Sequence, residues 1–444
     1  MFFNFDFKSF DMVTSILIKN ADWIVTQNQN RDVLKGSSIF IKGNKIVDIG
    51  NPETEADIVI NGKNKIILPG LINTHTHLGM TILRGYLDDM ELHEWLKRSW
   101  KVESKLTKKD VYYSSLLGCI EMIRNGITCF HDMYYFGDEV LKAVDESGMR
   151  GIFSQAILDT PVLEFKTPDQ ALKLVTRLKK KWKGNERAMV NVGPHAIYTC
   201  SKETLIKTKQ FADENNLSIH THLSETKKEV EDCLKNTGMR PVEYLRNIDF
   251  LSPNVLAAHC CWLTEKEIEI LKKNEVKVSH NPVSNMKTTA GIAPVPEMIN
   301  HDICIGLGTD SAASNNCLDL FQEMKIAALI HKVNKCNPVV VPAKKALEFA
   351  TIDGARALGL EKTIGSIQIG KRADIISVDL RESNLQPKGE KGTVLSNLVY
   401  SAKGNDVCDV ICNGEILVKD RELLTVDEER VYDEINKIIS DLLD

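Results

Sequence analysis

The sequence contains no uninterrupted apolar run of about 18 residues, which is the length that a membrane-spanning helix requires. Its opening, MFFNFDFKSFDM, has acidic side chains and lacks the basic stretch and apolar core of a secretory signal. The 11 cysteines are an odd number, are scattered apart from Cys260 and Cys261, and form no CxxC motif. We therefore expect neither a membrane span nor secretion, and the cysteine usage indicates a cytoplasmic location.

An excess of charge of one sign is also missing. The 61 acidic and 56 basic residues give a formal net charge of −5, without a long run of either sign. Such a chain lacks the basic footprint that binds a nucleic-acid backbone, so we expect no nucleic-acid partner. What is present is 43% apolar and 26% charged residues, a balance that favours an ordinary globular protein with a large core and excludes disordered and fibrous classes.

Two kinds of pattern divide the 444 residues. Residues 12–68 contain short β-branched runs separated by turn signals, and β-type sequence returns over residues 366–425, so the two ends are expected to form one β domain. Between them, residues 69–365 alternate strands with helical segments, which is typical of βα units on a parallel sheet. We expect a flexible extension over residues 1–11 and a helix over residues 426–444.

Eight apolar segments in the central part are candidate strands, and eight strands with intervening helices over about 300 residues favour a barrel rather than an open sheet. The segments are 66–74, 127–133, 151–158, 189–197, 217–223, 255–259, 276–281 and 303–310. The sequence therefore predicts an α/β protein with a (β/α)8 barrel.

Polar residues at the ends of these strands are candidates for chemistry, because the active site of such a barrel lies at the carboxyl ends of its strands. His75 and His77 alternate along one strand, so both side chains point the same way and can close on one ion. Other strands end in or just before histidines or carboxylates: His195, His220, His222, Glu225, His259 and Asp310.

Three neutral nitrogen donors, one carboxylate and an open position suit zinc or ferrous iron in a hydrolytic site. Such an ion lowers the pKa of water towards neutrality. Glu225 lies just beyond its strand, where it could exchange a proton with a substrate atom. His259 and Asp310 could carry the remaining protons.

The motifs PGLINTHTH, GPH, HTHLSET, LAAHC, VSHNPVSNMK and GTDSAASNN resemble the amidohydrolase superfamily. Within it, the chain is similar to deaminases of S-adenosylhomocysteine, methylthioadenosine and 5′-deoxyadenosine over nearly its whole length, from ILIKNADWIVT to GKRADIISVDL. The resemblance implies a (β/α)8 TIM-type barrel with a small β-sandwich domain composed of both chain ends. It also implies one divalent metal ion per subunit, zinc or alternatively iron, and we expect a homo-oligomer.

The resemblance also assigns residues. The metal ligands would be His75, His77, His222 and Asp310, with His220 deeper in the core or beside the ligands. His195 stands where binuclear relatives carry a modified lysine, which implies a mononuclear site and a substrate-binding role for this histidine. Glu103 matches a glutamate that holds the sugar hydroxyls, although a solvated helix glutamate is the plain alternative.

The activity implied is hydrolytic deamination of the 6-amino group of an adenine nucleoside. Glu225 would deliver a proton to N1, while His259 and Asp310 would handle the proton of water and the leaving ammonia. An alternative is a deaminase or chlorohydrolase of another heterocycle, such as cytosine, guanine or an s-triazine. A silent scaffold that has lost the ion is the non-enzymatic alternative, and the presence of every ligand position argues against it.

Two further expectations concern substrate contacts. Ser284 and Asn285, beyond the seventh strand, could either hydrogen-bond the base or hold their loop. Gln155 stands where relatives that favour S-adenosylhomocysteine have an arginine, and Lys166 is the nearby cation. Glutamine cannot form the paired hydrogen bonds of an arginine with a carboxylate, so we expect a preference for an uncharged 5′ group.

Overall fold

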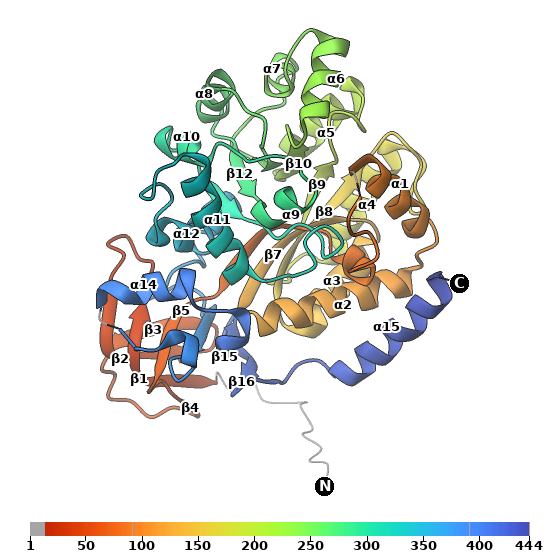
Figure 1. Cartoon of the computed structure of the whole chain (residues 1–444). Coiled ribbons are helices and arrows are strands. Elements are labelled where there is room, and N and C mark those ends of the chain that lie inside the picture. Colours follow the sequence, from red (N-terminus) through yellow and green to blue (C-terminus); the bar gives the residue numbers. More distant parts are fainter. Residues whose placement is uncertain (1–13, 91, 390, 444) are drawn as a thin grey trace.

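The structure is a computed structural model that describes residues 14–90, 92–389 and 391–443. The extension expected over residues 1–11 lies outside the described residues. Figure 1 shows a barrel surrounded by helices, with a separate sheet beside it that contains both the first and the last strands of the chain.

The barrel strands run parallel and are hydrogen-bonded in chain order. They are β6 (Leu71–Thr76), β7 (Ile127–Tyr134), β8 (Arg150–Ile157), β9 (Ala188–Pro194), β10 (Ile219–Leu223), β11 (Val255–His259), β12 (Lys277–His280) and β13 (Ile305–Leu307). The first and last strands meet just beyond β13, where the backbone N–H of Asp310 donates to the His75 carbonyl at 2.9 Å. Most strand residues are buried, as expected where both faces of a parallel sheet are covered.

Helices and loops cover the outside and the carboxyl rim of the barrel (Figure 1). Thr107, Thr167, Ser201, Thr226 and Thr264 cap the starts of five helices by accepting a backbone hydrogen bond. The helical segments are η1 (Leu78–Leu83), α1 (Leu92–Glu103), α2 (Lys108–Arg124), α3 (Gly137–Ser147), α4 (Pro168–Lys181), α5 (Lys202–Asn215), α6 (Lys227–Thr237), α7 (Pro241–Asn247), α8 (Glu265–Lys273), α9 (Pro282–Lys287), α10 (Val295–Asn300), α11 (Leu320–Asn334), α12 (Ala343–Phe349) and α13 (Ile352–Ala357).

The second sheet joins the two ends of the chain, because β5 pairs antiparallel with β14. Its strands are β1 (Ser15–Val25), β2 (Val33–Lys42), β3 (Lys45–Gly50), β4 (Ile58–Asn61), β5 (Lys65–Pro69), β14 (Ile375–Asp379), β15 (Val407–Cys412), β16 (Glu415–Lys419) and β17 (Glu422–Leu423). Isoleucines from seven of these strands form a separate apolar core. The predicted fold class, a (β/α)8 barrel with a small β domain from both ends, is confirmed.

The strand predicted over residues 66–74 is wrong in one respect, because this segment is divided between the two sheets at Gly70. β5 ends at Pro69 and pairs with β14, whereas β6 begins at Leu71 and pairs with β7. A Cβ atom at Gly70 would lie 2.1 Å from the Thr128 hydroxyl, so only glycine fits where the chain passes from one sheet to the other.

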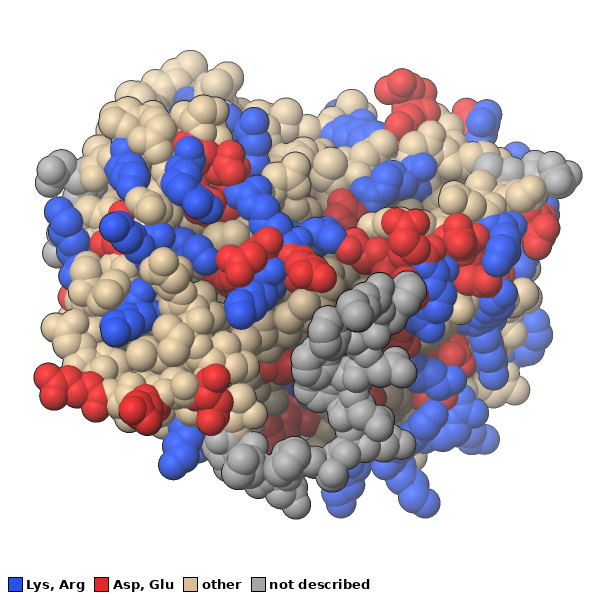
Figure 2. Space-filling model, turned by 90° about the horizontal axis from the view of Figure 1, so that it is seen from below, with Lys and Arg blue, Asp and Glu red and all other residues tan. Residues whose placement is uncertain are grey.

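The remaining elements close the outer surface. They are η2 (Ser383–Leu385), α14 (Lys391–Tyr400), η3 (Gly404–Asp406) and α15 (Glu428–Leu443). Helix α15 packs against α2, and Arg124 of α2 forms an ion pair with Glu428. Figure 2 shows basic and acidic side chains interspersed over one face of the molecule. Among the described residues, no helix is both long enough and apolar enough to span a membrane.

Candidate metal centre and active site

Two histidines at the end of β6 have their ring orientation fixed by neighbouring strands. His75 Nδ1 lies 2.8 Å from His220 Nε2, and His77 Nδ1 donates to the Met133 carbonyl at 2.6 Å. His75 is fully buried, and its Nε2 atom has no hydrogen-bond partner in the part of the chain that the structure describes. An unpaired buried nitrogen of this kind is a site for an ion or a water molecule.

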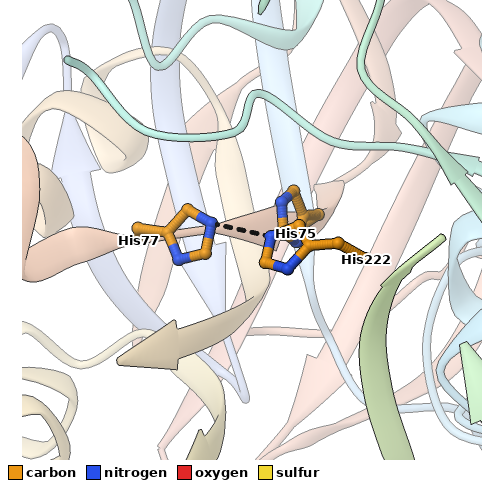
Figure 3. A group of neighbouring side chains, drawn as sticks. All are labelled: His75, His77 and His222. Carbon is orange, nitrogen blue, oxygen red and sulfur yellow. Dashed lines mark hydrogen bonds between the residues drawn. The ribbon is translucent and has the colours of Figure 1, made fainter. Parts of the chain in front are cut away.

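His222 on β10 completes a group of three imidazoles, shown in Figure 3. Its Nδ1 atom donates to the His195 carbonyl at 2.8 Å, and its Nε2 atom lies 3.3 Å from His77 Nε2, the contact that Figure 3 draws as a dashed line. Both rings use their Nδ1–H group on a carbonyl, so in the neutral form both Nε2 atoms are acceptors. Two lone pairs this close fit a cation between them.

Asp310, just beyond β13, adds a carboxylate to this group. Its Oδ1 atom lies 3.5 Å from His75 Nε2 and 3.4 Å from His77 Nε2. Ligand atoms about 2.0–2.1 Å from a tetrahedral ion are separated by about 3.3–3.4 Å. The spacing of the four side chains and their nitrogen and oxygen donors therefore fit a zinc-sized divalent ion.

The charges of these groups also suit a metal. Burial lowers the pKa of His75 to about 3 and lowers that of His222 well below its ordinary value, so both rings are neutral ligands. Burial alone would raise the pKa of Asp310, but the neighbouring His75 and His77 hold it well below its ordinary value. His75 and His222 therefore offer neutral imidazoles, and Asp310 offers an anion.

Hydroxyls and amides beyond β12 hold the acidic and basic groups in place. Ser284 and Ser314 donate to Asp310 Oδ2 at 2.6 and 3.0 Å, and Asn285 Oδ1 lies 2.8 Å from His259 Nδ1. The contacts of Ser284 and Asn285 are neither with a base nor within their own loop, because each side chain holds a neighbouring ionisable group of the site. His259 and Asp310 adopt positive φ angles of 73° and 61°, and such backbone strain is common at functional sites.

Glu225 and His259 form a second titratable pair beside the metal group. Glu225 Oε2 lies 4.0 Å from His259 Nε2. Burial raises the pKa of Glu225, which favours its protonated form. Burial alone would lower the pKa of His259, but the carboxylates of Glu225 and Asp310 raise it above its ordinary value. The pair can therefore both supply and accept a proton.

One cavity joins these groups. Seven of the eight predicted site residues line it, and His75 lies beside Asp310 as described above. The seven are His77, Glu103, His195, His222, Glu225, His259 and Asp310. The sequence prediction therefore selected residues from six segments of the chain that the structure brings together.

Glu103 and His195 lie on the walls of this cavity. Glu103, at the end of α1, accepts hydrogen bonds from Tyr134 at 2.6 Å and from Ser99 at 2.9 Å, so it is not a freely solvated helix residue. Burial raises its pKa. His195 Nδ1 lies 3.0 Å from the Thr199 hydroxyl, and burial lowers the pKa of His195 to about 3. A neutral imidazole and a carboxyl group thus face the same space.

Sequence reasoning did not select several aromatic wall residues. Trp100, Tyr134, Tyr135 and Tyr198 line the cavity together with Trp95. Tyr134 ends β7 and Tyr135 follows it, and the rule that selected histidines at strand ends would also have selected them. Aromatic walls are suited to the flat faces of a heterocyclic ring.

A second cavity adjoins the first, sharing Glu103 and three of the aromatic residues. Its other walls are mainly apolar, and Lys166 is the basic residue among them. Gln155, which stands where some relatives have an arginine, lines neither cavity. Its buried amide donates to Glu164 at 3.2 Å. The preference for an uncharged 5′ group stays a prediction, and Lys166 is the basic residue that lies at the cavity.

A metal-binding group at the carboxyl rim of a (β/α)8 barrel, with an acid–base pair beside it, defines a hydrolase of the metal-dependent barrel class. The model of the amidohydrolase family matches residues 66–417. The chain belongs to the amidohydrolase family.

Relatives in other organisms match almost the whole chain. A protein of Methanobrevibacter smithii named 5′-deoxyadenosine deaminase is 45% identical over 431 residues, covering 96% of this chain and 98% of its own. A Caldanaerobacter subterraneus protein named 5-methylthioadenosine/S-adenosylhomocysteine deaminase is 43% identical, covering 97% and 99%. Among solved structures, an adenosine deaminase of Xanthomonas campestris with bound zinc superposes with a TM-score of 0.93 at 30% identity, covering 96% and 98%.

Proposed function

We propose that this protein is a metal-dependent deaminase that hydrolyses the 6-amino group of adenine nucleosides modified at the 5′ position. The products are the corresponding inosine-type nucleoside and ammonia. One observation carries the proposal: a single cavity holds the metal-binding group, the Glu225–His259 pair and Glu103. The names of the relatives at 43–45% identity support the same reaction and the same substrates, 5′-deoxyadenosine, methylthioadenosine and S-adenosylhomocysteine.

The proposed cofactor is one divalent ion per subunit, zinc or alternatively iron. Its ligands would be the Nε2 atoms of the three imidazoles and the Asp310 carboxylate. When bound, such an ion lowers the pKa of water towards neutrality. The bound zinc of the Xanthomonas campestris structure supports this choice.

The side chains of the cavity divide the proton transfers of the reaction. A C6–O bond forms and the C6–N bond breaks. Glu225, whose pKa is raised by burial, gives its proton to N1 of the base. His259 and Asp310 accept one proton of the attacking water and return it to the departing amine. The second proton of the water leaves as the C6–O bond becomes a carbonyl, and it restores the proton of Glu225. Their positions on separate strands allow both to face the same substrate atom.

Glu103 and His195 would bind the nucleoside. The Glu103 carboxylate can accept hydrogen bonds from two neighbouring ribose hydroxyls. The His195 ring lies with its centroid 4.6 Å from that of His222, so it contacts the substrate close to the metal group. A free base has no ribose for Glu103 to hold, and this favours a nucleoside over another heterocycle as the substrate.

We further propose that the second cavity receives the 5′ substituent. It continues from Glu103, the residue that would hold the ribose, and is lined by Leu106, Val111, Phe136, Leu158 and other apolar residues. Burial of a methylthio group, or of the 5′-methyl group of 5′-deoxyadenosine, is favourable there. The homocysteine carboxylate would meet one cation, Lys166, whose Nζ atom already donates to the Val162 carbonyl at 3.2 Å.

The test is ammonia release from a panel of adenine nucleosides, with the ion present and after chelation. We expect kcat/KM for 5′-deoxyadenosine and methylthioadenosine to exceed that for S-adenosylhomocysteine by about tenfold or more, the scale of one hydrogen bond to a charged group. Lys166→Ala should reduce use of S-adenosylhomocysteine alone. A clear advantage of S-adenosylhomocysteine would contradict the 5′ proposal, and failure to release ammonia from any nucleoside would contradict the function.

As for partners and location, we propose a homo-oligomer that acts on a small nucleoside in the cytoplasm and binds no nucleic acid. The mixed charges of Figure 2 and the net charge of −5 support the last point.

A further inference from the structure

Glu229 is a buried carboxyl group that takes no part in the chemistry proposed above. It lies in the first turn of α6, its exposed fraction is 5%, and it does not line the cavity. Its Oε1 atom accepts a hydrogen bond from the backbone N–H of Ser224 at 2.9 Å, and its Oε2 atom accepts one from that of Glu225 at 2.8 Å. Both oxygens therefore bind the backbone that carries the proposed acid.

This arrangement differs from an ordinary helix cap. Thr226 is the N-cap of α6 and accepts a hydrogen bond from the Glu229 N–H at 3.1 Å, so Thr226 and Glu229 have the spacing of a capping box. In a capping box the glutamate returns to the N–H of the N-cap residue. Here the carboxylate passes Thr226 and binds the two preceding N–H groups, so it holds the loop before the helix rather than the helix end.

The loop held in this way has a strained conformation. Ser224 has a φ of +50°, in the left-handed region that a residue with a side chain rarely adopts. On its other side, the Ser224 carbonyl accepts a hydrogen bond from the Trp262 N–H at 3.0 Å. The direction in which the Glu225 side chain leaves the backbone therefore depends on contacts from both sides, and Glu229 supplies one of them.

We propose that Glu229 is a positioning residue that aims the Glu225 carboxyl group at the substrate base. This inference rests on the proposed function, in which Glu225 transfers the proton. The carboxyl group accepts from both N–H groups most strongly when it is ionised, because the hydroxyl oxygen of the protonated form is the weaker acceptor. Burial raises the pKa of Glu229 to about 7 although the hydrogen bonds from the two N–H groups oppose this rise, so the test is made at pH 8, where the ionised form predominates.

The variant Glu229→Gln tests the proposal, because glutamine keeps the size but replaces one acceptor oxygen with an NH2 donor. At pH 8 we expect kcat to fall about 10- to 100-fold, the scale of a small misplacement of a catalytic group, with little change in KM, metal content or melting temperature. The control is Glu231→Gln, an exposed glutamate of the same helix that pairs with Lys227. This control should behave as the wild type.

A double-mutant cycle separates positioning from general destabilisation. In a Glu225→Gln background, Glu229→Gln should cause no further loss of kcat, because the group that it aims is already disabled. The same fold-loss in both backgrounds, or wild-type kcat in the single variant, would overturn the proposal. If Glu229→Gln does not fold, Glu229→Asp, which keeps the carboxylate but shortens its reach, enters the same cycle with the same criteria.

A measurement that does not depend on catalysis tests this inference separately from the proposed function. Hydrogen exchange of the Ser224 and Glu225 backbone amides should be faster in Glu229→Gln than in the wild type and in Glu231→Gln. Unchanged exchange would show that Glu229 does not hold these two backbone amides, and it would overturn the proposal. A wild-type protein that shows this exchange pattern but deaminates no nucleoside would refute the proposed function while leaving the contact in place.

Discussion

At the scale of single residues, the site depends on side chains whose orientation is fixed by a second partner. The Nδ1 atoms of His77 and His222 donate to backbone carbonyls, and hydroxyls of Ser284 and Ser314 hold Asp310. Such partners set the tautomer and direction of a ligand. The donor atoms are therefore in position before an ion arrives.

Asp310→Asn is expected to reduce turnover by about 100-fold or more, because it removes the negative charge and the proton acceptor at the reacting centre. His259→Ala should act in the same way. Both residues lie at the strand rim, so we expect the circular dichroism spectrum to stay that of the wild type. Asp302→Asn, an exposed substitution of the same kind, is the control. Turnover close to that of the wild type in either site variant would contradict its assignment.

Glu225→Gln is expected to retain the metal ion and the fold but to lose about 100-fold or more in kcat, because an amide cannot transfer the proton. Elemental analysis of the purified variant beside the rate assay measures both properties. If the variant stays folded but loses its ion, Glu225 is a ligand and the division of roles is wrong.

The proposed ligands could be selected from sequence because alternation along a strand and the position of strand ends are local properties. The selection of His75, His77 and His222 required no further knowledge of the fold. Glu229 could not be selected in this way, because its spacing from Thr226 is that of an ordinary capping box. Only the structure shows that its carboxylate reaches the two preceding N–H groups.

At the scale of elements, seven of the eight barrel strands were placed within a few residues, and β11 was placed with the bounds that the structure gives. The exception was the segment at Gly70, where two strands follow each other without a polar interruption. Its two halves belong to different sheets because β14, some 300 residues later, pairs with the first half. A pairing at such a distance leaves no trace in the local pattern of apolar residues.

Helix α15 illustrates an element whose attachment depends on pH. Its Glu428 forms an ion pair with Arg124 of α2, and this hydrogen bond lowers the pKa of Glu428 below its ordinary value of 4.5. A lowered pKa stabilises the fold above the unfolded-state value, and the contribution is lost as the pH falls through the folded-state value. The contribution should therefore be complete at pH 7 and absent in strong acid.

Glu428→Gln is accordingly expected to lower the melting temperature at pH 7 by a small amount, since a partly exposed pair contributes about 1 kcal/mol or less. The difference from the wild type should shrink as the pH falls below about 4.5. Glu429→Gln, exposed on the same helix, serves as the control. A difference that is independent of pH would show that the ion pair is not the cause.

At the scale of the whole molecule, the sheet that joins both chain ends lies beside the barrel (Figure 1), and β5 continues directly into β6. The proposed metal ligands lie on or just beyond the first, fifth and last barrel strands. An ion bound among them would therefore link parts of the barrel that are far apart in sequence.

Removal of the ion should therefore lower the stability of the whole molecule as well as its activity. An ion that binds the folded chain alone adds about 2.7 kcal/mol at a concentration 100 times its Kd. We expect chelation to abolish ammonia release and to lower the melting temperature, and zinc to restore both. The variant His77→Ala, which lacks one ligand, should show a smaller effect of chelation on its melting temperature. If the chelated wild type keeps its activity and its melting temperature, the four side chains do not form a metal site. In the proposed arrangement both the activity and part of the stability depend on the bound ion.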